Sequence, residues 1–286
     1  MGVLNRPETV PERIRAWLPD LPPAERRVAR LVLAHHPLAG LDTASALAAQ
    51  AGTSTPTVLR LLARLGFDGW ADFQRASRAE LADRLAGPAD LYPPDDTREA
   101  GGPGAVASAV ACSLALVPRA EVDTAVRLLA DQRRPVWTVG GRWSGVLADY
   151  LAMHLQLLRP LVRRVGQVPG GTAGALLDVD RRAVVVAFDY RRYQFDVIAF
   201  GGQAVDRGAE LVLFTDHLVS PLAGRARAVL STTVDAGSPF TVLSPGMALV
   251  DTLVARLVDV LGAAPRARMA RYDELALGLV QGVDSG

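Results

Sequence analysis

The chain has 286 residues, of which 50% are hydrophobic and 21% are charged. This length suits two domains better than one, and the apolar content is sufficient for a sizeable core, so wholesale disorder is excluded. The formal net charge is only +1, and all 31 basic residues are arginines. Such a balance excludes a generally basic coat for nucleic acid, so any contact with DNA must come from a local cluster.

The single cysteine, Cys112, cannot form a disulfide within the chain, which fits a reducing compartment. Its apolar neighbours predict a small, buried hydrophobic side chain. The sequence has no basic start followed by an apolar signal core, and no apolar run of membrane-spanning length. We therefore expect a cytoplasmic protein without a membrane partner.

The first 85 residues have the spacing of helices. Thr9 and Glu12 form a capping-box pattern that begins the first of them. Four more helices are predicted near residues 24–36, 42–50, 55–65 and 70–85. The stretch 87–104, rich in Pro, Gly and Asp, predicts a linker. Residues 1–86 are therefore expected to form an all-α domain.

Residues 41–73, LDTASALAAQAGTSTPTVLRLLARLGFDGWADF, carry the most informative pattern of this half. Gly52 follows the first of two short helices and can adopt the positive φ that a tight turn needs. Ser54 or Thr55 is suited to cap the second helix. Pro56 falls in its first turn, where a missing N–H costs nothing. The pattern predicts two helices joined by a tight turn.

The second of these helices, residues 55–65, has two different faces. Its apolar residues recur at i, i+3, i+4 and i+7 and are expected to point inward; they are Val58, Leu61, Leu62 and Leu65. Thr57, Arg60 and Arg64 fall on the opposite face. Hydroxyl residues at its start and arginines further along suit the major groove of DNA. A surface helix with solvated arginines fits the same spacing, so the pattern alone leaves both interpretations open.

A longer motif runs through this helix and beyond it. Its residues are Gly52, Ser54, Thr57-Val58, Arg60, Leu65-Gly66-Phe67, Gly69-Trp70 and Phe73. The motif resembles the N-terminal domain of transcription regulators of the RpiR/MurR type, and the resemblance covers about residues 9–85. It implies that residues 55–65 enter the groove of double-stranded DNA. The contact residues that it implies are Ser54, Thr55, Thr57, Arg60 and Arg64.

Beyond the linker, short apolar runs alternate with helical segments. The predicted strands are residues 135–139, 161–165, 183–188, 210–215 and 228–232. Nearly continuous apolar strands separated by helices predict a parallel sheet covered on both faces. We assign residues 105–264 to this α/β domain and residues 265–286 to a C-terminal tail whose role stays open.

The loop after the first of these strands is Gly140-Gly141-Arg142-Trp143-Ser144-Gly145. A glycine-rich loop between a strand and a helix offers free backbone N–H groups to an anion. RpiR-type regulators join their DNA-binding domain to a sugar isomerase (SIS) domain, a five-stranded parallel sandwich that binds phosphosugars. Residues 105–262 resemble that domain in order and length. The glycine-rich loop itself points to ligand contacts at Gly140, Gly141 and Arg142. The resemblance implies further contacts at Ser144, Thr215 and Ser220.

The loop after the third strand departs from the family pattern. The usual phosphate loop is Ser-x-Ser-Gly-x-Thr, whereas this chain has Phe188-Asp189-Tyr190-Arg191-Arg192 at that place. An ionised Asp189 repels a phosphate, whereas Arg191 and Arg192 can bind an anion through paired N–H groups. We add these three residues to the expected ligand site. In the alternative interpretation, the arginines only neutralise Asp189 and Asp196.

Two enzyme classes compete with the regulator. A dinucleotide-dependent oxidoreductase needs glycine where Arg142 stands and an acidic residue at the end of the next strand, which ends instead in Arg163-Arg164. A sugar-phosphate isomerase needs a base near the sugar. His217 is the only histidine near a predicted strand end, and no glutamate lies in the candidate loops.

The sequence as a whole therefore predicts an all-α helix-turn-helix domain joined to an SIS-type α/β domain. We expect a transcriptional regulator of carbohydrate or related metabolism, by default a repressor, rather than an enzyme. A small, anionic, sugar-like effector is its expected ligand, and no metal or other cofactor is expected. Because helix-turn-helix readers usually act as pairs on palindromic operators, we also expect a homodimer or homotetramer.

Overall fold

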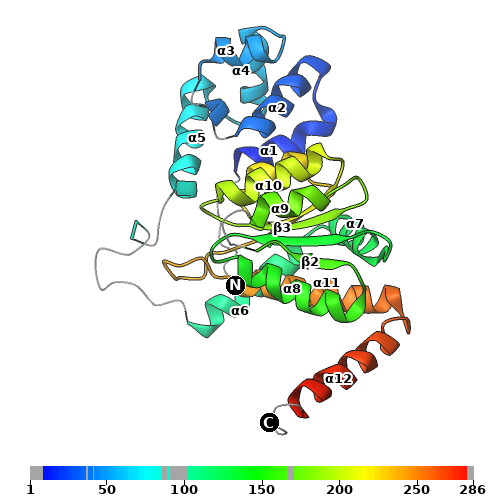
Figure 1. Cartoon of the computed structure of the whole chain (residues 1–286). Coiled ribbons are helices and arrows are strands. Elements are labelled where there is room, and N and C mark those ends of the chain that lie inside the picture. Colours follow the sequence, from blue (N-terminus) through cyan, green and yellow to red (C-terminus); the bar gives the residue numbers. More distant parts are fainter. Residues whose placement is uncertain are drawn as a thin grey trace. The chain divides into compact units, whose positions relative to one another are not determined.

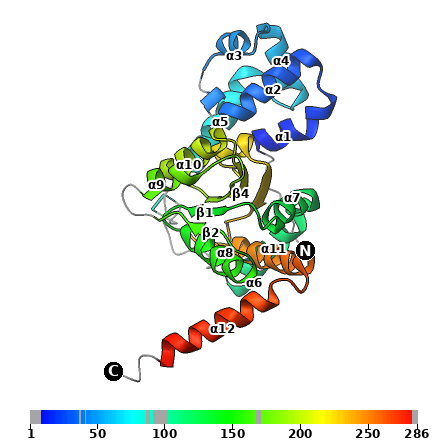
Figure 2. The same cartoon turned by 45° about the vertical axis from the view of Figure 1, so that its right-hand side comes forward.

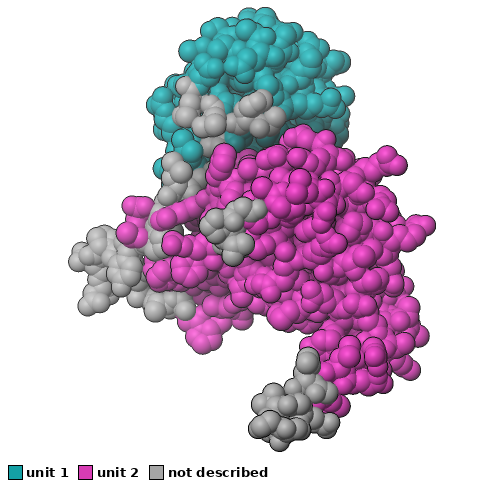
Figure 3. All heavy atoms as spheres, in the orientation of Figure 1, with its two compact units in different colours: residues 1–87 teal, residues 88–286 magenta. Residues whose placement is uncertain are grey.

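A computed structural model describes residues 9–36, 38–40, 42–85, 89–90, 102–166 and 171–281. The chain divides into two compact units, residues 1–87 and residues 88–286 (Figure 3). Most of the predicted linker 87–104 lies outside the described residues. Its last two residues are helical, because the first helix of the second unit begins at Pro103.

The first unit is built from helices, which Figure 1 shows in blue and cyan. They are α1 (Val10–Trp17), α2 (Pro23–His35), α3 (Ala44–Gln50), α4 (Thr55–Arg64) and α5 (Gly69–Leu85), with short 3-10 turns at Leu18–Asp20 and Leu38–Gly40. The predicted capping box is confirmed, because Thr9 and Glu12 exchange hydrogen bonds at the start of α1. Apolar side chains from all five helices meet in one core, among them Ile14, Val28, Leu47, Leu61 and Phe73.

The second unit contains a five-stranded parallel sheet, as predicted. Its strands are β1 (Val136–Gly140), β2 (Val162–Arg164), β3 (Val184–Asp189), β4 (Glu210–Asp216) and β5 (Ala228–Thr232), in the spatial order β2-β1-β3-β4-β5. The helices are α6 (Pro103–Leu116), α7 (Arg119–Ala130), α8 (Gly145–Leu158), α9 (Gly171–Asp178), α10 (Phe195–Asp206), α11 (Ser244–Leu261) and α12 (Arg266–Gln281). A short 3-10 turn, η3, spans Pro221–Arg225.

Helices cover both faces of this sheet (Figure 2). Along β3 the side chains alternate, so that Val184 and Val186 pack with α7, α8 and α11, whereas Val185 and Ala187 pack with α9 and α10. This alternation follows from the two-residue period of a strand. It explains why the central strands are apolar throughout, since neither face meets water.

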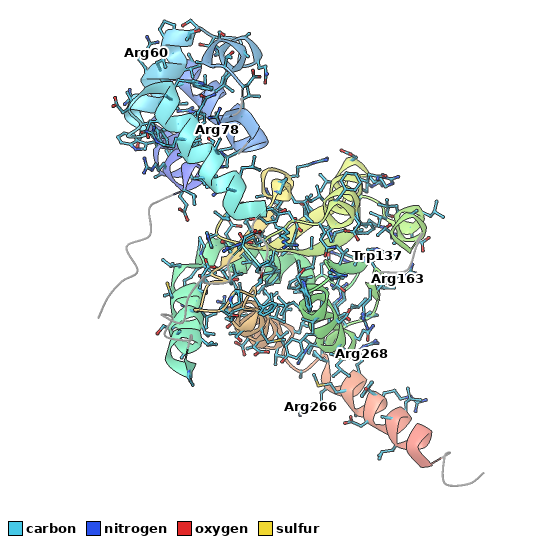
Figure 4. The ribbon with its side chains drawn as sticks, turned by 90° about the vertical axis from the view of Figure 1, so that its left-hand side faces the viewer. Arg60, Arg78, Trp137, Arg163, Arg266 and Arg268 are labelled. Carbon is cyan, nitrogen blue, oxygen red and sulfur yellow. The ribbon has the colours of Figure 1, made fainter. Side chains whose placement is uncertain are left out.

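The edge strand β2 is shorter than the predicted strand 161–165, and its two arginines are exposed. Within the described part of the chain, this strand pairs only with β1. Its Arg163 lies over the Trp137 ring of β1, with the guanidinium carbon 5.1 Å from the ring centre (Figure 4). The predicted burial of Cys112 is wrong. This residue is exposed on α6, whose apolar residues surround the whole helix instead of lining one side.

The tail that the sequence left open contains a helix, α12. Near its start, the Arg268 Nε donates to the Gln156 carbonyl of α8 at 2.6 Å. Among the described residues, no single helix is long and apolar enough to cross a membrane. Only α6 and α7 together meet that length and composition, and the two are bent by 81° from one another.

Candidate DNA-binding helix and effector site

The outer face of α4 is the candidate DNA-binding surface. Gly52 adopts a φ of +59° in the turn before α4, as the sequence predicted. The apolar residues Val58, Leu61 and Leu62 are buried beneath the helix. The exposed residues on its other side are Pro56, Leu59, Arg60, Ala63 and Arg64. The spacing argument therefore assigned the inner face correctly.

One residue that the sequence predicted on the exposed face of α4 is buried in the structure. Thr57 is only 5% exposed. The helices packed around α4 cover not only its apolar face but also the position of Thr57. Its hydroxyl lies 3.0 Å from the Ser54 hydroxyl and accepts from the Arg60 Nη2 at 3.0 Å. Ser54 is the residue that precedes α4, and Thr55 begins the helix half-buried. Thr57 is thus placed to hold Ser54 and Arg60 in position.

An acidic residue of α2 lies beneath the arginines of α4. Glu25 is buried, and its carboxylate accepts from the Arg64 Nε at 3.1 Å. The Arg60 Nε lies 3.9 Å from the same carboxylate. Arg64 also lies over the Trp17 ring. Arg64 therefore links α4 to α1 and α2, whereas the Arg60 side chain is 64% exposed (Figure 4).

In the second unit, the strand order places a topological switch point between β1 and β3. The chain passes from β1 to β2 on one side and then to β3 on the other. In open α/β sheets of this order, ligands bind outside the carboxyl ends of the two strands at that point. Gly140 ends β1, and Asp189 ends β3. The predicted ligand residues of both loops therefore lie at the edge where this rule places a site.

The glycine-rich loop after β1 is tightly folded. A Cβ on Gly140 would lie 2.7 Å from the Gly145 Cα, a backbone atom that cannot move aside. The Ser144 hydroxyl donates to the Phe188 carbonyl at 2.6 Å and accepts from the Gly141 N–H at 2.9 Å. Ser144 thus joins the β1 and β3 ends, and its hydroxyl is already engaged by the chain.

The neighbouring N–H of Arg142 is engaged as well. It donates to the side-chain oxygen of Gln194, the residue that precedes α10. Gln194 has no feature in the sequence that marks it as part of a site. Its role depends on the approach of two loops 52 residues apart in the chain.

Asp189 lies at the centre of this arrangement and is only 1% exposed. One carboxylate oxygen accepts from the Gln194 N–H at 3.1 Å, and the other accepts from the Ser220 hydroxyl at 2.5 Å. Burial raises the pKa of Asp189 to about 7, although these two hydrogen bonds act in the opposite direction. Thr215 joins the same network, since its hydroxyl accepts from the Ser220 N–H at 3.0 Å.

The two arginines of the loop differ in their surroundings. The Arg191 side chain is 9% exposed, and its Nη2 donates to both oxygens of Asp235, at 2.9 and 3.0 Å. This ion pair differs from the pairing with Asp189 and Asp196 that was the alternative interpretation. Arg192 is exposed and adopts a φ of +46°, so the backbone turns sharply at this residue.

A second buried carboxylate, Asp216, ends β4 and was missed as a site residue. It accepts from the Tyr193 hydroxyl at 2.7 Å, the Leu218 N–H at 2.8 Å and the Arg191 N–H at 2.5 Å. Burial raises the pKa of Asp216, as it does for Asp189. The carboxyl ends of β3 and β4 thus hold the loops after them through internal hydrogen bonds to two carboxylates.

A tight helix-turn-helix and a doubly covered parallel sheet with a site at its switch point define a two-domain, DNA-binding regulator. Comparison with known families agrees with this class. Residues 9–86 match the helix-turn-helix domain of the rpiR family, and residues 128–257 match the SIS domain. The helical unit therefore belongs to the rpiR family of helix-turn-helix domains, and the α/β unit is an SIS domain. These matches confirm the resemblance to RpiR-type transcriptional regulators that the sequence showed.

Individual relatives share this architecture. The chain is 26% identical over 221 residues to the uncharacterized HTH-type transcriptional regulator YbbH of Bacillus subtilis (strain 168), covering 73% of this chain and 76% of the relative. The sugar isomerase domain of an RpiR transcription factor from Sphaerobacter thermophilus matches 59% of this chain and 94% of its own, with 19% identity and a TM-score of 0.55. The Vibrio vulnificus NanR protein, solved with ManNAc-6P, matches 95% of this chain and 99% of its own, with 20% identity and a TM-score of 0.54.

Proposed function

We propose that the chain is a cytoplasmic repressor of genes for carbohydrate or related metabolism. In this proposal, α4 reads a palindromic operator, and a small sugar-like effector bound at the β1/β3 switch point alters the affinity for DNA. The observation that carries the proposal is the exposed Arg60 on the outer face of α4, held by Thr57 beside the buried Glu25. A guanidinium fixed in this way is suited to the paired acceptors of guanine.

Replacing Arg60 by alanine is expected to weaken specific operator binding by about 1–3 kcal/mol, the range for a side chain that reads a base through two hydrogen bonds. The operator is first selected from random duplexes with the full chain, and affinities are then measured by fluorescence anisotropy. Arg133→Ala is the charge-matched control, because Arg133 is exposed in the other unit and pairs with Asp131. Equal operator affinity of the wild type and Arg60→Ala would remove α4 as the reading helix.

The effector site is supported by the convergence of the two loops at the switch point, where Ser144 and Gln194 join them. NanR carries ManNAc-6P in its solved structure, and this likeness favours a sugar-like ligand here. We infer a sensing role rather than catalysis, because Asp189 and Asp216 are both held by hydrogen bonds from the chain itself. A fold shared with sugar isomerases does not by itself confer their chemistry.

A homodimer or homotetramer is the proposed assembly, with α6 as the contact surface. This helix carries no charged residue, and its Leu116 is 73% exposed. An apolar helix on the surface of a chain with 21% charged residues is typical of an interface. The helix packs on α11, on the sheet face opposite to α9 and α10.

Leu116→Asp is therefore expected to convert the assembly into monomers, because each copy would have to bury a carboxylate at the contact. The mass is measured by light scattering at micromolar concentration. The matched control is Leu177→Asp, since Leu177 is 88% exposed on α9, on the other face of the sheet. A monomeric wild type, or the same mass for all three proteins, would contradict the proposed surface.

A further inference from the structure

The carboxyl group of Asp189 lies at the N-terminus of α10 and binds the N–H of the residue that precedes this helix. Unpaired N–H groups and the helix dipole make such a terminus a binding site for negative charge. Here the Asp189 carboxylate takes that place, because it accepts from the Gln194 N–H directly before α10 and from the Ser220 hydroxyl. The carboxylate is almost completely buried. Its position is therefore fixed by the surrounding chain, and the side chain does not extend into solvent.

We propose that Asp189 is a built-in substitute for a ligand phosphate, so that the effector is an unphosphorylated polyhydroxy compound, a sugar or a sugar acid. This inference rests on the proposed sensing site and names its ligand class. It differs from the likeness to NanR, whose solved ligand is a phosphorylated sugar.

The donors that bind Asp189 and the side chain of Gln194 are already used by the chain. The Gln194 N–H and the Ser220 hydroxyl bind Asp189, whereas the Arg142 N–H of the facing loop binds the Gln194 side chain. A phosphate at this place would have to displace the carboxyl group, or lie against it with two like charges in contact once Asp189 is ionised. Both alternatives cost free energy, since like charges that share a buried site repel and neither is hydrated.

The same loop still offers a donor that suits a less highly charged ligand. The Nε of Arg191 is buried and has no hydrogen-bond partner among the described residues, although the Nη2 of this side chain binds Asp235. A buried donor without an acceptor is unfavourable, and the oxygen of a sugar hydroxyl or a single carboxylate satisfies it. Because Asp235 already balances the Arg191 charge, no dianion is needed for neutrality.

The test measures the binding of inorganic phosphate and of glucose 6-phosphate to the full-length protein, by calorimetry and thermal shift. Glucose and gluconate serve as unphosphorylated probes. The measurements are made at about pH 8, where an Asp189 with the raised pKa is mostly ionised. The wild type is expected to bind neither phosphate compound. Asp189→Ser removes the carboxylate from the N-terminus of α10 and is expected to gain about tenfold or more in phosphate affinity.

Asp196→Asn is the matched control. Asp196 is an exposed residue in the first turn of the same helix, so this variant removes one negative charge near the site without opening it. Its phosphate affinity is expected to stay at the wild-type level. Asp189→Asn keeps the shape of the buried side chain and removes only its charge. If Asp189→Ser does not fold, Asp189→Asn is expected to show the part of the gain in phosphate affinity that comes from relief of charge repulsion.

The inference is overturned if the wild type binds glucose 6-phosphate as tightly as the Asp189 variants do. It is also overturned if Asp196→Asn gains as much phosphate affinity as they gain, since the effect would then be one of net charge. Operator binding is measured on the same samples. Absence of specific operator binding would remove the proposed function, whereas release of the operator from the wild type by a phosphosugar would remove only the inference about Asp189.

Discussion

Replacing Arg159 by alanine is expected to lower the free energy of unfolding of the α/β unit by about 3–5 kcal/mol. Arg159 follows α8 and is 0% exposed. Its guanidinium donates to the carbonyls of Leu129 at 2.5 Å, Pro160 at 3.2 Å and Arg134. Truncation leaves these three carbonyls without their donor and creates a cavity between α7, α8 and β1.

The planar guanidinium of Arg159, with its several N–H donors, accounts for the size of this effect. Burial lowers the pKa of Arg159 to about 10, so the side chain is still charged at neutral pH. Arg159→Lys retains the charge but lacks the planar set of donors, so it is expected to restore only part of the lost stability. Calorimetry of the full chain separates the units, because the transition of the helical unit serves as an internal reference.

Arg133→Ala is the control for this experiment as well. Arg133 is exposed and pairs with Asp131 near the surface, and such pairs contribute about 0–1 kcal/mol. A loss of stability in Arg159→Ala no larger than that of Arg133→Ala would show that the buried guanidinium does not hold α7, α8 and β1 together.

The stability of the α/β unit is expected to fall by about 2–3 kcal/mol between about pH 5 and pH 8 through Asp189 alone. Burial raises the pKa of Asp189 to about 7 in the folded chain, from an ordinary value of 3.8. Over this interval the folded state therefore binds more protons than the unfolded state, and raising the pH favours unfolding. The decline ends above the folded-state pKa, where the carboxyl is ionised in both states.

The measurement compares the pH dependence of denaturant unfolding in the wild type and in Asp189→Asn. The variant cannot titrate at this position, so its decline with pH is expected to be shallower. Part of the decline persists in the variant, because burial also raises the pKa of Asp216. An identical slope in both proteins would mean that Asp189 is ionised throughout this range in the folded chain.

Local patterns in the sequence were sufficient to predict the helices of the first unit, the strands of the second and the resemblance to the family. The i, i+3, i+4, i+7 spacing identified the buried face of α4, and Gly52 marked the turn before it. The apolar strands, each separated from the next by a helix or turn, predicted the five-stranded parallel sheet. These features depend on neighbours within a few residues, so they can be recognised along the chain.

These local patterns could not identify interacting residues that are far apart in the chain. Glu25 meets Arg64 over 39 residues, and Asp189 meets Ser220 over 31 residues. In the sequence, Arg159 resembles any charged residue at the end of a helix. Only the packing of α7 and α8 around it shows that it is buried. Such side chains carry a charge that must be paired or hydrated, and the folded chain alone decides which of the two occurs.

The sequence by itself determined the helices of the first unit, the five parallel strands of the second, the resemblance to the family and the face of α4 that points inward. Only the tertiary structure decided that Thr57 is buried, that Arg64 binds Glu25 and that Asp189 binds the N–H directly before α10. The physical reason is the range of the interactions. Periodicity records on which side of its own element a residue lies, whereas burial and charge pairing depend on the element that packs against it.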